Sequence, residues 1–123
     1  LENMKIIEEE NLLGNVRAMG DHLMTRLLEL KDKHAVVGDV RGKGLFVGLE
    51  LVADRATKQP ADESYAMKIA GHCMLQGVMI GRTNRSFRDF NNTLCLSPAL
   101  IATRRDIDDI ADALDAALAA TPL

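Results

Sequence analysis

Hydrophobic and polar residues alternate from Gly44 to Val52, and this pattern is the clearest one in the chain. One side of the alternation is apolar and consists of Leu45, Val47, Leu49 and Leu51. The other side consists of Phe46, Gly48, Glu50 and Val52. A period of two bounded by glycines is typical of a half-buried strand. An Arg-Gly-Lys-Gly corner at 41–44 connects it to a short apolar run at 36–40, so we predict a two-stranded hairpin.

The N-terminal stretch repeats its apolar residues every three or four positions, as an amphipathic helix does. The repeat predicts one long helix from Asn3 to about Lys33, with Asn3 as its N-cap. Gly14 and Gly20 each weaken a helix by roughly 1 kcal/mol relative to alanine, so we expect them to allow a close crossing with a neighbouring element. The apolar positions are Leu12, Val16, Met19, Leu23, Leu27 and Leu30.

Two more helices carry recognisable start and stop signals. Asp62 or Ser64 is expected to cap the second helix, which continues to about Gln76 and ends at a glycine. Thr103 is expected to cap the last helix, and Asp106 three residues later completes a capping-box pattern.

The remaining segments predict two strands and two loops. The strands are Val78–Arg82 and Thr93–Ser97, and the loops are the polar segment 53–61 and the irregular segment 83–92. The resulting element order is α-β-β-α-β-β-α. This order favours a two-layer α+β fold whose mostly antiparallel sheet carries its helices on one face.

The chain length of 123 residues suits a single domain. Within it we distinguish a long connecting helix at 1–34 from a small α+β domain at 35–123. Because the first residue is Leu1 and not methionine, we expect the chain to be processed or to be a piece of a longer one, with an upstream domain absent.

Composition excludes several classes of protein. The chain is 47% hydrophobic and 27% charged, which is ordinary for a globular protein. A formal net charge of −3 argues against a nucleic-acid partner. No apolar run reaches membrane-spanning length and no signal peptide is recognisable, so we expect no membrane association and a cytoplasmic location.

The residues that could ligate a metal or act as nucleophiles do not form a known motif. Cys73 and Cys95 are expected to be buried free thiols. No metal-binding spacing links them to a histidine, so no metal site is predicted. The three histidines are expected to be surface or packing residues, and they are His22, His34 and His72. The last helix carries a face that we expect to be solvated, formed by Asp108, Asp109, Asp112 and Asp115.

Arg82 has a more informative position than the other charged residues. It continues the side of a strand that Val78 and Ile80 occupy, and it lies immediately before the irregular loop 83–92. An arginine at such a rim can offer its planar fork of N–H groups to a carboxylate, or it can simply be solvated. The residue pattern leaves both interpretations open.

Four landmarks, in this order and spacing, resemble the class III (omega-type) pyridoxal-phosphate aminotransferases. They are RGKGLFVGLEL at 41–51, GVMIGR at 77–82, LSPAL at 96–100 and TRRDIDDIADALDAAL at 103–118. Within the class, the segments GVMIGRTN and NNTLCLSPAL are most similar to the branch that acts on omega-amino acids and pyruvate. The resemblance covers nearly the whole chain.

The resemblance implies a fold, a reaction and one residue role. The fold is the small C-terminal domain of a fold-type I aminotransferase that works as a homodimer. The reaction moves an amino group from an omega-amino acid or amine to pyruvate or another keto acid. Arg82 matches the arginine that binds the substrate carboxylate, and Thr83 and Asn84 are weaker candidates at the same entrance.

The cofactor implied by the resemblance is pyridoxal phosphate, which a lysine of the large domain holds. That lysine and the phosphate-binding residues have no counterpart here. We therefore expect no catalytic residue and no cofactor-binding residue in this chain, and no tight binding of pyridoxal phosphate by the chain alone.

Two alternatives do not need an aminotransferase. The chain could be a free-standing α+β domain that binds a small molecule, because a fold does not fix a function. It could also be an oligomerisation module that uses its long first helix as a partner surface.

Overall fold

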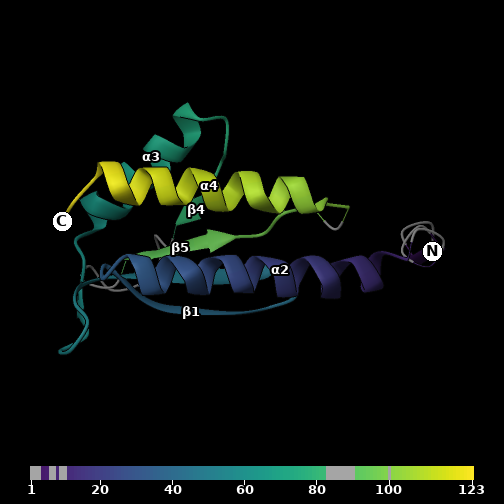
Figure 1. The fold of residues 1–123 in the computed structure, drawn as a ribbon, viewed down its shortest axis with the longest axis horizontal. Coiled ribbons are helices and arrows are strands. Elements are labelled where there is room, and N and C mark those ends of the chain that lie inside the picture. Colours follow the sequence, from purple (N-terminus) through teal and green to yellow (C-terminus); the bar gives the residue numbers. More distant parts are fainter. Residues whose placement is uncertain (1–3, 6–7, 9–10, 83–90, 100) are drawn as a thin grey trace.

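The fold is taken from a computed structural model of the chain, which describes residues 4–5, 8, 11–82, 91–99 and 101–123. Three helices lie against one face of a sheet (Figure 1). The helices are α2 (Leu12–Lys33), α3 (Glu63–Leu75) and α4 (Arg104–Ala120). The strands are β1 (Val37–Lys43), β2 (Phe46–Asp54), β3 (Gln59–Pro60), β4 (Gly81–Arg82) and β5 (Thr93–Leu96). The predicted α+β class is confirmed.

Every strand pair that the structure describes is antiparallel. The strands follow the order β1-β2-β5-β4, and β3 pairs with the far end of β2. The hairpin predicted from the glycine-rich corner is present, with Lys43 opposite Phe46 and a two-residue loop between them. Gly44 in that loop has a φ of 58°, a left-handed conformation that glycine adopts without strain. The loop predicted at 53–61 contains the short strand β3, which the sequence pattern does not indicate.

The apolar side of β2 is the centre of the core. Leu49 and Leu51 are fully buried, and Phe46 on the opposite side is 73% exposed, as the alternation predicts. Val52 departs from the pattern and is buried, because its side chain packs against Gly38 of β1. The helices complete the core with fully buried side chains, which include Leu23, Leu27, Ile69, Ile107 and Leu114.

Helix α2 does not start where the sequence predicts. The helical pattern indicates an unbroken helix from Asn3, but Asn11 has a φ of 51° and α2 begins at Leu12. Asparagine tolerates the left-handed conformation better than most residues, so a single residue can interrupt a pattern that is otherwise continuous. The prediction of one uninterrupted helix is therefore wrong at this residue.

The C-terminal end of α2 is held by a side chain from the β2–β3 connection. The guanidinium of Arg55 donates hydrogen bonds to the carbonyl oxygens of Lys31, His34 and Val37, at 2.6, 3.1 and 2.8 Å. The last carbonyls of a helix have no partner within the helix and attract cations. Arg55 therefore ties the end of α2 to the start of β1.

Gly20 allows α2 to cross directly over the hairpin loop. A Cβ atom at position 20 would lie 2.6 Å from the carbonyl oxygen of Gly44, and the atoms it would meet belong to the backbone. The crossing predicted for this glycine is confirmed. A glycine inside a helix costs stability, and here the cost permits backbone-to-backbone contact between α2 and the hairpin.

We expect Gly20→Ala to lower the free energy of unfolding by about 1–3 kcal/mol, because the new methyl group overlaps a backbone carbonyl that cannot move independently. Gly71→Ala is the matched control, since a Cβ there meets no atom within 4 Å on an exposed face of α3. That control should gain up to about 1 kcal/mol from helix propensity. Urea denaturation of both variants measures the difference, and equal effects at the two sites would contradict the close crossing.

No helix in the described part of the chain combines the length and apolar character that crossing a bilayer requires.

Candidate functional site

Helices α2 and α4 run side by side in the same direction and are joined by a ladder of charged groups (Figure 1). His22 Nε2 lies 2.6 Å from Asp108 Oδ1, and Arg26 donates to Asp108 at 2.7 Å and to Asp112 at 2.6 Å. Further along, Asp115 accepts from Lys33 at 2.9 Å and contacts His34 Nε2 at 2.7 Å. We call these residues the α2–α4 ladder.

The ladder corrects one prediction. The aspartate face of α4 is not simply solvated, because three of its four aspartates pair with α2; Asp109 has no partner among the described residues. His22 of α2 and His34, which follows its last residue, are packing residues, in agreement with the prediction. They contribute to the contact between two helices that are more than 80 residues apart in sequence.

Hydrogen bonding in the ladder changes the acidity of its carboxyl groups. The hydrogen bond from His22, followed by that from Arg26, holds the pKa of Asp108 below its ordinary value. The hydrogen bonds from His34 and then Lys33 lower the pKa of Asp115 in the same way. A carboxyl group whose pKa is lower in the folded state stabilises the fold above its unfolded pKa, and this contribution is lost as the pH falls through the folded pKa.

We expect Asp115→Asn to lower the melting temperature at pH 7 by roughly 2–5 °C, since it removes a half-exposed pair. The difference from the wild type should begin to shrink below about pH 4, where the unfolded carboxyl group becomes protonated, and should keep falling through the lower pKa of the folded state. Asp109→Asn removes a charge from the same helix and should change the melting temperature little. Thermal denaturation at pH 7 and pH 3 makes the comparison, and a difference as large at pH 3 as at pH 7 would contradict the ionic origin.

Arg82 lies on the edge strand β4, where β5 and α3 hold it from two sides. In the sheet Arg82 pairs with Leu94 of β5, and the Nη1 atom of Arg82 donates a hydrogen bond to Glu63 Oε1 at 2.6 Å. The side chain of Arg82 is 28% exposed and that of Glu63 is 37% exposed. The predicted strand is shorter than expected, since the segment from Val78 to Ile80 is not part of β4. Thr83 and Asn84 lie outside the described residues.

Glu63 is a residue that sequence reasoning missed. It occupies the first turn of α3, directly after the N-cap Asp62, whose side chain accepts from the backbone N–H of Ser64 at 2.8 Å. An acidic residue at this position is common, because the N-terminal end of a helix favours negative charge. The position of Glu63 at a helix start is enough to account for an acidic residue there. The sequence pattern therefore gives no signal that Glu63 contacts Arg82, 19 positions further along the chain.

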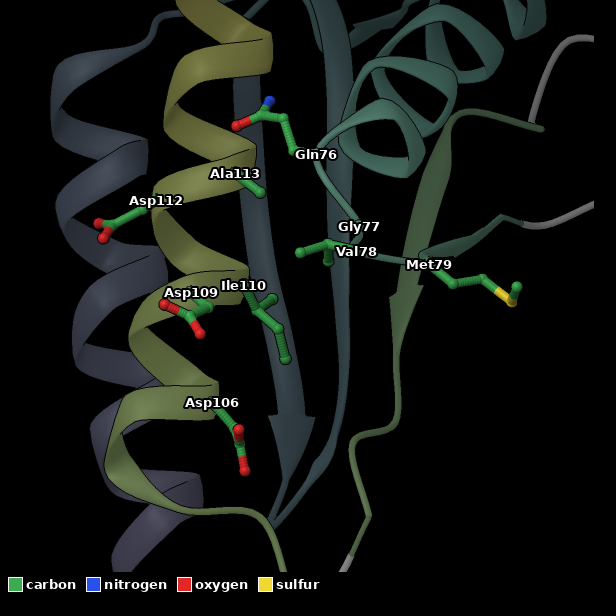
Figure 2. A pocket seen from close by; sticks show the side chains of 9 residues that line it. All are labelled: Gln76, Gly77, Val78, Met79, Asp106, Asp109, Ile110, Asp112 and Ala113. Carbon is green, nitrogen blue, oxygen red and sulfur yellow. The ribbon is translucent and has the colours of Figure 1, made fainter.

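An open groove of about 650 Å³ lies between α4 and the segment 76–79 (Figure 2). Ile110 and Val78 point into it, and Met79 points away. The carboxylates that line the groove belong to α4. Hydrogen bonds from the backbone and side chain of Thr103 lower the pKa of one of them, Asp106. The groove has an apolar floor, acidic neighbours and no cationic lining residue, so it does not suit a substrate carboxylate.

The described thiols and acidic residues suit neither the role of a nucleophile nor that of a metal site. Burial raises the pKa of Cys73 to about 11, which leaves it a protonated thiol near neutral pH. Both Cys73 and Cys95 are free, as predicted, but only Cys73 is buried; Cys95 is half-buried because it lies on the side of β5 that faces away from the core. No group of three or more potential metal ligands occurs within the described ranges.

The family profile described as aminotransferase class III matches residues 1–118 of the chain. A hypotaurine/taurine–pyruvate aminotransferase from Paracoccus denitrificans is 60% identical over 118 residues, which cover 96% of this chain and 26% of that protein. The structure is similar to a Bacillus anthracis aminotransferase, with a TM-score of 0.93 and 38% identity over 98% of this chain and 27% of the other.

A further similar structure is an amine transaminase from an uncultivated Pseudomonas species in its pyridoxal-phosphate-bound form. Its TM-score is 0.84 and its identity 38%, over 96% of this chain and 26% of the other. The chain spans about a quarter of the length of the curated relatives it matches. With a profile match over most of its residues, the chain belongs to the class III aminotransferase family.

Proposed function

We propose that the whole protein is a pyridoxal-phosphate-dependent aminotransferase that moves an amino group from an omega-amino acid or amine to pyruvate. The observation that carries this proposal is the 60% identity to a hypotaurine/taurine–pyruvate aminotransferase. Taurine and hypotaurine are accordingly the first donors to test. The alternatives of a free-standing ligand-binding domain or an oligomerisation module have no specific observation in their favour.

In this proposal, Arg82 binds the carboxylate of pyruvate and of the alanine that forms from it. A guanidinium presents N–H donors in a planar fork that matches the two oxygens of a carboxylate. The contact recorded for Arg82 within the described residues uses Nη1 and one oxygen of Glu63. A guanidinium carries five N–H donors, so one hydrogen bond to Glu63 is compatible with binding a second anion. Thr83 and Asn84, which follow Arg82 in the chain, are proposed to line the same entrance.

The residues of this chain do not fit the cofactor itself. Pyridoxal phosphate is held covalently by a lysine, and such a lysine is shielded from water. All six lysines are described, and none is buried: Lys31 is half-buried and the others are exposed. We therefore assign to this chain the binding and orientation of the substrate, and no step of the chemistry on the cofactor.

The location and assembly of the whole protein are also proposals. Two free cysteines are consistent with a reducing compartment, and we propose the cytoplasm. Large apolar side chains are exposed on the chain, with Leu75, Met79 and Phe46 at 88, 83 and 73%. Such exposure is typical of surfaces that are covered in a larger assembly, in keeping with a homodimer.

We expect the 123-residue chain alone not to retain pyridoxal phosphate, because it has no shielded lysine. The chain is mixed with the cofactor and passed through gel filtration, and its visible absorbance is recorded. A cofactor band that remains with the protein would contradict the assignment.

We expect Arg82→Ala in the full-length holoenzyme to raise the KM for pyruvate roughly tenfold to hundredfold, since a charge-assisted contact to the carboxylate is lost. The half-reaction with a primary amine that carries no anionic group should be retained. Visible absorbance follows the two half-reactions separately, first with the amine and then with pyruvate. Equal losses in both half-reactions would mean that Arg82 supports the fold and does not recognise the carboxylate.

A further inference from the structure

We infer that Glu63 is a positioning residue that limits how strongly Arg82 attracts a substrate carboxylate. This inference rests on the proposed function of Arg82, and it assigns a role to a second residue of the same site. Glu63 does not touch the substrate in this scheme. It acts through the orientation and the charge of the guanidinium.

Glu63 and Arg82 form a close pair between two packed elements. Glu63 begins α3 and Arg82 ends β4, and these two elements are packed against each other. The distance of 2.6 Å between Oε1 and Nη1 is that of a short charge-assisted hydrogen bond. Glu63 is also the acceptor recorded for Arg82 in the described part of the chain. The carboxylate of Glu63 therefore occupies one end of the guanidinium and fixes the direction in which its remaining donors point.

The negative charge of Glu63 lies beside the position that a substrate carboxylate would take. A substrate carboxylate that binds Arg82 comes close to a second negative group, because Glu63 is in contact with the same guanidinium. Like charges at such separations repel, and solvent screens the effect only partly, because the side chains of Arg82 and Glu63 are 28 and 37% exposed. The substrate must either share the guanidinium with Glu63 or displace it. In both cases Glu63 weakens the binding of carboxylates and leaves uncharged substrates unaffected.

The position of Glu63 at the helix N-terminus supports this role. The N-terminal end of α3 favours negative charge, so a carboxylate there is stabilised whether or not Arg82 is bound to it. Arg82 can therefore leave Glu63 for a substrate without abandoning an unsupported charge. When the substrate is an amine without a carboxylate, Glu63 gives the guanidinium an alternative partner.

The test compares two acceptors with full-length holoenzyme. Glu63→Gln removes the charge and keeps a hydrogen-bond acceptor. We expect it to lower the KM for pyruvate roughly two- to fivefold, with kcat unchanged, and to leave the KM for propanal, which has no carboxylate, within experimental error. Glu63→Asp retains the charge and should keep the KM for pyruvate near the wild-type value.

Two further variants control for the loss of a negative charge elsewhere in the chain and for destabilisation by the substitution itself. Asp32→Asn removes one negative charge from α2, where Asp32 has no hydrogen-bonding partner in the described ranges, and should leave both KM values unchanged. Glu63→Ser should reproduce the effect of Glu63→Gln, and it replaces that variant if the glutamine form melts at a lower temperature. An unchanged or raised KM for pyruvate in the uncharged variants, or an equal change for propanal, would overturn the inference.

The same assay separates this inference from the proposed function. A wild-type enzyme that transfers no amino group to pyruvate overturns both. A wild-type enzyme that is active, with Arg82→Ala selectively impaired toward pyruvate and Glu63→Gln unchanged, overturns the role of Glu63 alone.

Discussion

The apolar side of β2 is the constraint on which the rest of the structure depends. This strand pairs with β1, β3 and β5, and its buried leucines Leu49 and Leu51 contact the layer of helices. Because β5 is aligned on β2 and β4 on β5, the place of Arg82 follows from the register of the central strand. A shift of that register by one residue would turn Leu49 outward and would move Arg82 away from Glu63. Packing in the core and geometry at the site are therefore set by the same pairing.

The parts of the fold that could be predicted are those encoded over short distances in the sequence. The alternation in β2, the caps Asp62 and Thr103 and the capping box with Asp106 all depend on residues within a few positions of each other. The interruption at Asn11 could not be predicted from periodicity, since one left-handed residue leaves the apolar pattern intact. The buried state of Val52 was also missed, because it depends on a cross-strand neighbour at Gly38.

The site was predictable only in part, for a similar reason. The rim position of Arg82 follows from the strand pattern, and its role as a carboxylate anchor follows from family resemblance and stays a proposal. Its partner Glu63 and the α2–α4 ladder depend on which helix packs beside which strand or helix. That information is tertiary, and a helical pattern identifies a buried face without identifying its neighbour. The sequence pattern consequently gives no sign that His22 and His34 each have an aspartate partner on α4.

The contact of Arg55 with three carbonyls has a consequence for the order of folding events. The side chain that satisfies the end of α2 lies 24 residues beyond Lys31 and follows the entire β1–β2 hairpin in the chain. The last turn of α2 can form early as a fluctuating helix, but its free carbonyls gain this partner only after the hairpin has closed. Completion of the helix is thus coupled to a non-local event, and the final turn of α2 should acquire its native protection from solvent together with the sheet.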